Sequence, residues 1–191
     1  ALGFLARSPA TQPFALLCQF KAPHRGWEPA PRFADRFKDI EIPPPPGLYE
    51  TLEDRPLAIR LSELRIADMM DYRKRGVAAD LPEAERARLN FQHLIKDYYR
   101  VLLGVDENVG RILEYLDRSG LAENTLVVYT TDNGFFLGEH GLFDKRLMYE
   151  PSIRVPLLVR HPASVPAGQV DDRHMLLNVD VAPTFLDAAG V

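Results

Sequence analysis

The sequence predicts an α/β fold, in which helices cover a β-sheet, and three observations support this prediction. Short apolar runs of strand length, one of them rich in β-branched residues, recur along the chain. Between two of these runs lies a long stretch whose apolar residues follow helical spacing. The resulting order of strand, long helix, two strands and a final helix is typical of α/β proteins.

The first part of the chain is predicted to hold one buried strand and much irregular structure. Pro13–Phe20 is a continuous apolar run, typical of a central strand that is covered on both faces. We expect Cys18, in the middle of this run, to be a buried small hydrophobic residue and not a nucleophile. The proline-rich segment 42–47 is expected to be a stiff, extended spacer. Residues 56–75 are predicted to form a broken, charged helix.

The second part of the chain has the clearer secondary-structure signals. A long helix is predicted to begin near Pro82, with acidic residues in its first turn, and to end at a glycine stop, Gly120. Thr125–Thr131 and Val155–Arg160 are predicted strands. Val181–Ala189 is the last predicted helix, and a glycine follows it directly.

Composition and charge narrow the functional classes. The 191 residues are 46% hydrophobic and carry a net charge of −4, with basic residues spread along the chain, so we expect no nucleic-acid or anionic-membrane partner. No apolar run approaches the roughly 20 residues of a membrane-spanning helix. The single cysteine allows no internal disulfide and gives no information on the redox compartment. Because the first residues include neither an initiator methionine nor a signal peptide, we expect the sequence to begin inside a longer protein.

Polar side chains follow two of the predicted strands, where the sheets of α/β proteins collect their ligands. His24 follows the first of these strands. Asp132 and Asn133 follow another, and His140 and Lys145 come shortly afterwards. A carboxylate beside an amide oxygen is a hard ligand pair that suits Ca²⁺ or Mg²⁺. These residues are therefore the candidates for a metal and substrate site.

Each of these signals also has a simpler interpretation. Asn133-Gly134 between apolar runs is typical of a tight hairpin turn, and on its own the dipeptide is better explained in that way. His140 between two glycines and Lys145 in a charged stretch are equally compatible with solvated side chains. His24 can be a loop histidine that packs against Trp27. The residues therefore do not decide between a site and ordinary loops when they are taken one at a time.

Taken in order, these segments resemble the second half of the type I sulfatases, a family of the alkaline-phosphatase-like superfamily. The matching string is a strand, Asp132-Asn-Gly, Gly138-x-His-Gly, Lys145, Tyr149-Glu and Arg154-Val-Pro-Leu-Leu-Val-Arg. Upstream, Lys21-Ala-Pro-His is similar to the Lys-x-Pro-His segment of the family. The resemblance implies a mixed, mostly parallel sheet flanked by helices, of which this chain is an incomplete part. Residues 1–191 would then be the second half of a catalytic domain.

The resemblance also implies roles for individual residues. In the family an Asp-Asn pair at a strand end binds a divalent cation, usually calcium, and this pair matches Asp132 and Asn133. A lysine about a dozen residues later contacts the sulfate, and it matches Lys145. A histidine contacts the sulfate ester and can protonate the leaving alcohol, and it matches His24. We expect His140, in its glycine-flanked turn, to contact the substrate as well.

The nucleophile of the family is a formylglycine made from Cys or Ser within a Cys/Ser-x-Pro-x-Arg motif. This motif does not occur in the chain, and Cys18, which is followed by Gln-Phe-Lys-Ala, is not its cysteine. We expect the nucleophile and the Asp-Asp metal pair of the family to lie upstream of residue 1. We therefore expect the 191 residues alone not to turn over a sulfate ester.

The leading hypothesis is that the parent protein hydrolyses sulfate monoesters, on a sulfated small molecule or glycan. The sequence around Asp144-Lys-Arg and Tyr149-Glu is similar to the corresponding sequences of glycan sulfatases that act on sulfated amino sugars. The cofactor would be a divalent cation, Ca²⁺ before Mg²⁺, and the resemblance implies a periplasmic, secreted or lysosomal protein. Three alternatives remain: a phosphonate monoester or phosphodiester hydrolase of the same superfamily, a non-catalytic metal- or glycan-binding relic, and an ordinary α/β domain with a hairpin turn at 133–134. The sequence does not indicate an oligomeric state.

Overall fold

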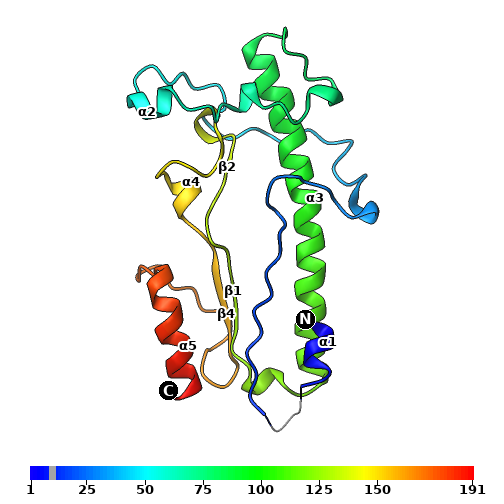
Figure 1. The fold of residues 1–191 in the computed structure, drawn as a ribbon, viewed down its shortest axis with the longest axis vertical. Helices are drawn as coiled ribbons and strands as arrows, with labels where there is room; N and C mark the ends of the chain where they lie inside the picture. The colour runs from blue at the N-terminus through cyan, green and yellow to red at the C-terminus, as the bar shows by residue number, and fades with distance from the viewer. Residues whose placement is uncertain (9–11) are drawn as a thin grey trace. The chain divides into compact units, whose positions relative to one another are not determined.

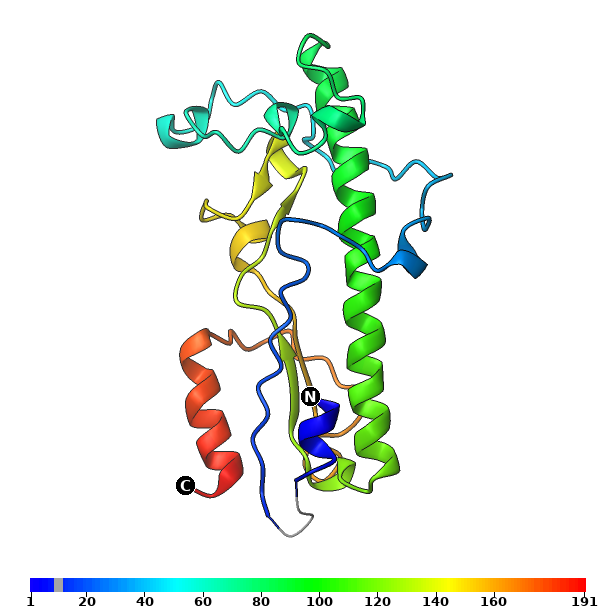
Figure 2. The same cartoon turned by 45° about the vertical axis from the view of Figure 1, so that its right-hand side comes forward.

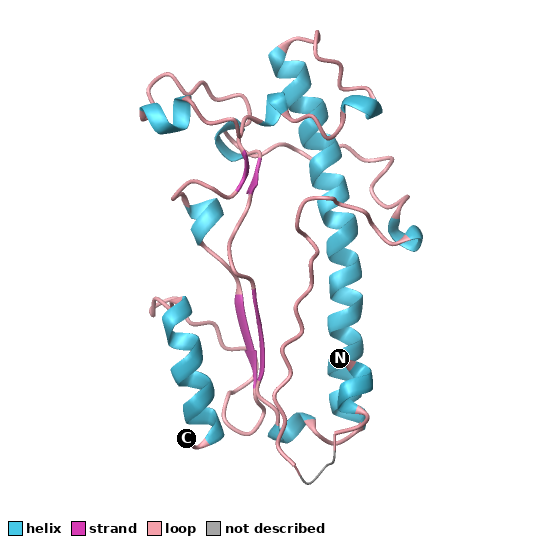
Figure 3. Ribbon diagram, in the orientation of Figure 1, coloured by secondary structure: helices cyan, strands magenta, loops and turns pink. Residues whose placement is uncertain are grey.

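The computed structural model describes residues 1–8 and 12–191. Within these residues the chain forms two compact units. The first comprises residues 1–112 and 131–155, and the second comprises residues 113–130 and 156–191. Helices and loops make up most of the described chain, and the strands are short (Figure 3).

The first unit is organised around residues 83–112 of the helix α3 (Glu83–Arg118), which has 36 residues in all and is unbroken in both views (Figures 1 and 2). Two acidic residues lie in its first turn, where they interact favourably with the helix dipole. The helix ends as predicted, because Gly120 adopts a left-handed conformation at φ 71°. The amide of Leu121 then donates a hydrogen bond to the carbonyl of Leu116. The long helix and its glycine stop are thus confirmed.

Shorter helices accompany α3 in the first unit. They are α1 (Leu2–Leu5), η1 (Pro31–Phe33), α2 (Leu57–Arg60), η2 (Ile66–Asp68), η3 (Arg73–Arg75), η5 (Glu139–Gly141) and α4 (Glu150–Ile153). Three of them, α2, η2 and η3, occupy the segment 56–75, which confirms the prediction of a broken helix there.

The main core of the first unit lies where one face of α3 packs against loops. Its buried residues are Trp27, Leu48, Ile66, Ala67, Met69, Tyr72, Val77, Ala87, Phe91, Leu94, Ile95, Val101 and Phe143. Polar side chains of α3 form hydrogen bonds with backbone carbonyl groups of the loops that pack against it. The side-chain amide of the buried Asn90 donates to the carbonyl of Ile66 at 2.7 Å, and that of Gln92 donates to the carbonyl of Ile42 at 2.6 Å. The proline-rich segment 42–47 is thereby held against α3 at its first residue.

A small β-hairpin completes the first unit. Its strands, β2 (Phe136–Leu137) and β3 (Phe143–Asp144), are antiparallel, with Phe136 opposite Asp144 and Leu137 opposite Phe143. A second buried cluster anchors the hairpin and consists of Leu52, Ile59, Phe136 and Leu142. The hairpin therefore carries residues 144 and 145 on a packed support.

The second unit contains the other two strands and the last helix. β1 (Val127–Thr130) pairs antiparallel with β4 (Leu157–Arg160), and η4 (Ala122–Asn124) precedes β1. α5 (Val181–Ala189) follows η6 (Asn178–Asp180) and ends at Gly190, whose φ is 74°. These elements confirm the strands predicted at Thr125–Thr131 and Val155–Arg160 and the final helix. No helix within the described residues combines the length and apolar character needed to cross a membrane.

The predicted strand at Pro13–Phe20 is wrong. Residues 13–20 have no regular secondary structure and are drawn as loop in Figure 3. A strand requires a hydrogen-bonded neighbour, and none of the described segments pairs with this one. For the same reason Leu17 is 81% exposed, and Cys18, which we expected to be buried, is exposed as well.

The described strands support the α/β class but differ in detail from the expected sheet. Each of the two described sheets has two strands, and both pairs are antiparallel. The mostly parallel sheet that the resemblance implies is not found among these residues. The hairpin alternative at 133–134 is also wrong, because β1 pairs with β4 and not with the segment that follows Gly134.

Candidate functional site

A small pocket in the first unit brings together two segments that lie far apart in the sequence. The cavity measures about 110 Å³, which is enough for several waters or a tetrahedral anion. Its lining residues are His24, Arg25, Phe135, Phe143, Asp144, Lys145 and Arg146. Two of the predicted site residues, His24 and Lys145, therefore line one pocket. Three basic side chains and one carboxylate give it a net positive lining that suits an anionic ligand.

The loop that carries His24 is anchored by Trp27. The indole nitrogen of Trp27 donates to the carbonyl of Pro23 at 2.8 Å, and its ring stacks on Tyr72 with centroids 6.4 Å apart. The amide of His24 donates to the carbonyl of Lys21 at 2.9 Å, which closes a tight turn. The Trp27 ring is buried while His24 is exposed, so the tryptophan fixes the loop and leaves the imidazole accessible.

Lys145 follows β3 directly, and a hydrogen bond from a later segment of the chain holds its backbone in place. The hydroxyl of Ser152, a residue that is only 4% exposed, donates to the carbonyl of Lys145 at 2.5 Å. The preceding residue, Asp144, has a left-handed backbone at φ 75°, and its carboxylate lies 3.7 Å from the guanidinium of Arg146. A non-glycine residue in that conformation is uncommon and requires support from its surroundings.

The same serine also holds the loop that contains the Asp-Asn pair. The amide of Gly134 donates to the carbonyl of Ser152 at 2.8 Å. A Cβ atom on Gly134 would lie 2.1 Å from the carbonyl oxygen of Pro151, so only glycine fits this close approach. Gly134 is thus explained by contact with residues 151–152 and not by a hairpin turn. Through Ser152 the structure couples the 132–134 loop to Lys145.

Asp132 and Asn133 are not among the residues that line the pocket. Asp132 is exposed, and the hydroxyl of Thr131 donates to its carboxylate at 3.3 Å. The side-chain nitrogen of Asn133 donates to the carbonyl of Gly134 at 2.7 Å, which leaves the amide oxygen of Asn133 as the group that can bind a metal. These oxygens are of the type that Ca²⁺ or Mg²⁺ takes, but such ions need six or more ligands. Among residues 1–8 and 12–191, no three His, Cys, Asp or Glu side chains form a group that can hold a metal.

His140 is within hydrogen-bond distance of Glu50 and is not one of the residues that line the pocket. Its Nδ1 lies 2.7 Å from the carboxylate of Glu50, which also accepts a hydrogen bond from Arg55. These bonds, that from Arg55 first, lower the pKa of Glu50 below its usual value of 4.5. The backbone of His140 is left-handed at φ 55°, between two glycines with positive φ. A contact between His140 and a substrate therefore stays a prediction.

Three charged lining residues, Arg25, Asp144 and Arg146, were not predicted from the sequence. Each is a direct neighbour of a predicted site residue, and this adjacency was the available signal. Arg25 donates two hydrogen bonds to Asp71, and these bonds raise the pKa of the guanidinium above its usual value. The guanidinium is therefore a permanent positive charge at the pocket.

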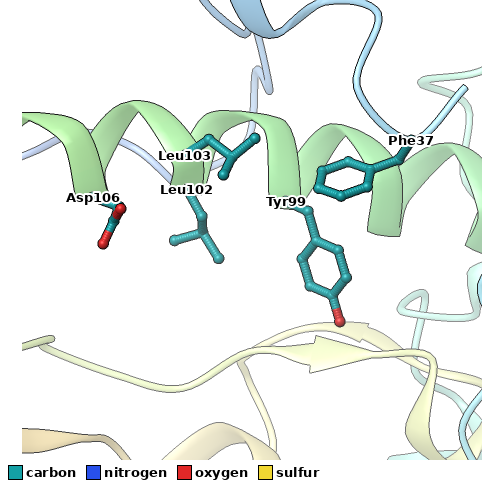
Figure 4. A pocket seen from close by; sticks show the side chains of 5 residues that line it. All are labelled: Phe37, Tyr99, Leu102, Leu103 and Asp106. Atoms are coloured by element: carbon teal, nitrogen blue, oxygen red, sulfur yellow. The ribbon is translucent and has the colours of Figure 1, made fainter.

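A second hollow, of about 240 Å³, lies along α3 (Figure 4). It is lined by Phe37, Tyr99, Leu102, Leu103 and Asp106. Phe37 and Tyr99 meet edge to face with ring centroids 5.9 Å apart. With four apolar or aromatic residues and one carboxylate, this hollow has no group that attracts an anion. The smaller basic pocket is therefore the better candidate site.

Comparisons with known proteins agree with the resemblance. The sequence model of the Sulfatase family matches residues 1–191. The N-acetylglucosamine-6-O-sulfatase of Bacteroides thetaiotaomicron is 35% identical over 100% of this chain and 42% of its own length. The N-acetylglucosamine-6-sulfatase of Capra hircus is 29% identical over 100% of this chain and 31% of its own length. The chain thus spans less than half the length of these relatives.

Two solved structures are also similar to this chain. A structure of the protein BT4656 in complex with its substrate D-glucosamine-2-N,6-O-disulfate matches with a TM-score of 0.88 at 34% identity, over 100% of this chain and 47% of that one. A phosphonate monoester hydrolase from Silicibacter pomeroyi matches less closely, with a TM-score of 0.50 at 30% identity over 58% of this chain and 21% of its own. Because the family match extends over every residue, this chain belongs to the sulfatase family.

Proposed function

We propose that the full-length protein containing this chain is an enzyme that hydrolyses sulfate monoesters on a carbohydrate, with a 6-O-sulfated amino sugar as substrate. The observation that carries the proposal is that His24 and Lys145 line one basic pocket. The relatives named for N-acetylglucosamine 6-sulfates support the choice of substrate. The proposal includes the mixed, mostly parallel sheet of the alkaline-phosphatase-like fold, to which these residues contribute.

The two pocket residues have complementary roles in this proposal. Negative charge develops on the leaving oxygen of a sulfate ester and remains on its other oxygens, and the ammonium group of Lys145 stabilises the charge on the sulfate. An imidazole exchanges protons near neutral pH, so His24 protonates the leaving alcohol. The nucleophile is by resemblance a formylglycine, whose sequence motif these 191 residues do not contain.

Asp132 and Asn133 would contribute oxygen ligands to a divalent cation, which we propose to be Ca²⁺, with Mg²⁺ as the alternative. Such an ion supplies positive charge to the oxygens of the sulfate. The hydrogen bond from Gly134 to Ser152 keeps the loop of this pair connected to the backbone of Lys145. We propose His140 as a further substrate contact that forms only if its turn rearranges, since Glu50 holds it in the present structure.

A parallel assay of two ester classes tests the function. The full-length protein is given N-acetylglucosamine 6-sulfate and, separately, a phosphonate monoester at equal concentrations. We expect faster release of inorganic sulfate, with activity lost on chelation of divalent ions and restored by Ca²⁺. A preference for the phosphonate would support the phosphonate hydrolase instead, and turnover of neither would support a non-catalytic relic.

A further inference from the structure

Arg25 is one of three permanently charged basic side chains that line the His24–Lys145 pocket, and the proposed reaction does not use it. It lies beside His24 in the sequence and lines the same cavity as Lys145. Its side chain is 47% exposed, so the guanidinium is accessible to a ligand. The question is whether this arginine only ties its loop to the protein or also binds what enters the pocket.

The guanidinium of Arg25 is fixed on two sides. Its Nε donates to one carboxylate oxygen of Asp71 at 2.9 Å, and its Nη2 donates to the other at 2.6 Å. Its plane also lies over the ring of Phe143, 5.6 Å from the ring centroid. Phe143 is buried and precedes Asp144 and Lys145 on the hairpin. A side chain held in this way loses little conformational entropy when a ligand binds.

The ion pair with Asp71 leaves several N–H donors of the Arg25 guanidinium unused. A guanidinium has five N–H donors, and this ion pair takes two of them. No described residue accepts a hydrogen bond from the remaining nitrogen, Nη1. Asp71 is not a lining residue of the pocket, so its carboxylate orients Arg25 from outside without occupying the cavity. This arrangement presents a rigid, charged donor beside Lys145.

We propose that Arg25 binds an oxygen of a sulfate group of the substrate, and that Asp71 is the residue that positions it. This inference rests on the proposed function and deepens it. Arginine donors match the oxygens of tetrahedral anions in both charge and geometry. The sulfate can be the group that is hydrolysed or a second sulfate on the same sugar, and the experiment below separates these two sources.

The test compares Arg25→Gln with wild type in the full-length protein, on N-acetylglucosamine 6-sulfate and on D-glucosamine-2-N,6-O-disulfate. We expect kcat/KM to fall about 10- to 100-fold, as for the loss of one charge-assisted hydrogen bond. An equal loss on both substrates assigns Arg25 to the reacting sulfate. A loss on the disulfate alone assigns it to the second sulfate. Values within twofold of wild type on both substrates would overturn the proposal.

The chain offers a matched control in Arg32. This residue makes the same fork, to Glu107, with distances of 2.9 and 2.6 Å, and its guanidinium also lies over a phenylalanine ring. It does not line the pocket. Arg32→Gln should therefore leave kcat/KM unchanged while removing an equivalent ion pair. An equal loss of activity in this variant would mean that Arg25 acts only through the stability of the fold.

The positioning role of Asp71 has its own readout. Asp71→Asn should lower kcat/KM about 3- to 10-fold in the wild-type protein, because an amide cannot accept the charged fork as a carboxylate does. In the Arg25→Gln background the same change should have no further effect. A full additional loss in that background would show that Asp71 has a separate, structural role and would contradict the positioning assignment.

Two further measurements keep the proposal testable if a variant fails. If Arg25→Gln does not fold, Arg25→Lys can replace it, because lysine keeps the positive charge but lacks the two-pronged guanidinium. The loss of activity in Arg25→Lys should be smaller than the loss in Lys145→Ala. Should the wild-type protein hydrolyse neither sulfate, the proposed function fails by itself. Binding of inorganic sulfate, measured by calorimetry, then still tests Arg25: weaker binding to an Arg25 variant than to wild type supports the inference, and equal binding overturns it.

Discussion

The close approach of Gly134 to residues 151–152 gives a sharp prediction for Gly134→Ala. An added Cβ would lie 2.1 Å from the carbonyl oxygen of Pro151, 2.9 Å from its carbonyl carbon and 3.0 Å from the carbonyl carbon of Ser152. All three are backbone atoms, so no side-chain rotation relieves the contact. An ordinary van der Waals contact begins at 3.4 Å, so the backbone segments must separate by roughly 1.3 Å.

The separation has a cost that follows from the structure. It breaks the 2.8 Å hydrogen bond between the amide of Gly134 and the carbonyl of Ser152, which is worth about 1 kcal/mol. Forcing an extra carbon into a packed site costs a further 1–3 kcal/mol or so. We therefore expect Gly134→Ala to lower the free energy of unfolding by about 2–4 kcal/mol.

Denaturant unfolding of the full-length protein measures this loss. The control is Gly104→Ala within α3, where an added Cβ meets nothing within 4 Å. Since alanine is the better helix former, the control should raise the free energy of unfolding by about 0.5–1 kcal/mol. A change of less than about 0.5 kcal/mol for Gly134→Ala would refute the close contact between the 132–134 loop and Ser152.

Three further predictions concern the residues around the pocket. Lys145→Ala should lower kcat/KM for a sulfate ester by about 100-fold or more, with unchanged thermal stability, because a preorganised charge at the reacting group is lost. Ser152→Ala removes the donor to the carbonyl of Lys145, and it should lower both the melting temperature and kcat; unchanged kcat would contradict the positioning role of this bond. Glu50→Gln should destabilise the protein at neutral pH. Because the folded pKa of Glu50 is below 4.5, its stabilising effect is complete above that pH and is lost as the pH falls through the lowered pKa. Melting temperatures of wild type and Glu50→Gln should therefore converge in acid, and a constant difference would contradict the assignment.

The local signals in the sequence predicted the two longest described helices, α3 and α5, and the strands β1 and β4, but not the short strands β2 and β3. α3 and α5 carry their own start and stop signals, so their bounds could be predicted without tertiary information. The run Pro13–Phe20 has the composition of a buried strand, but a strand is defined by its neighbour. The composition of a segment does not reveal whether another of the described segments pairs with it as a strand. The predicted strand was therefore wrong, and so was the predicted burial of Cys18.

Only part of the candidate site could be predicted, because some of its residues depend on contacts between distant segments. His24 and Lys145 follow from the order of motifs along the chain, and the structure brings them to one pocket. Arg25, Ser152 and Glu50 act through partners that are 46, 7 and 90 residues away, respectively. No local pattern reports such contacts, because they arise only when the chain has folded.

A crystal structure of the full-length protein with inorganic sulfate or a substrate sulfate bound tests the roles of His24 and Lys145 most directly. We predict one sulfate group within hydrogen-bond distance of both the Nζ of Lys145 and the imidazole of His24, in the pocket that Arg25 and Asp144 also line. A sulfate bound elsewhere, with Lys145 and His24 too far apart to reach one anion, would contradict this prediction.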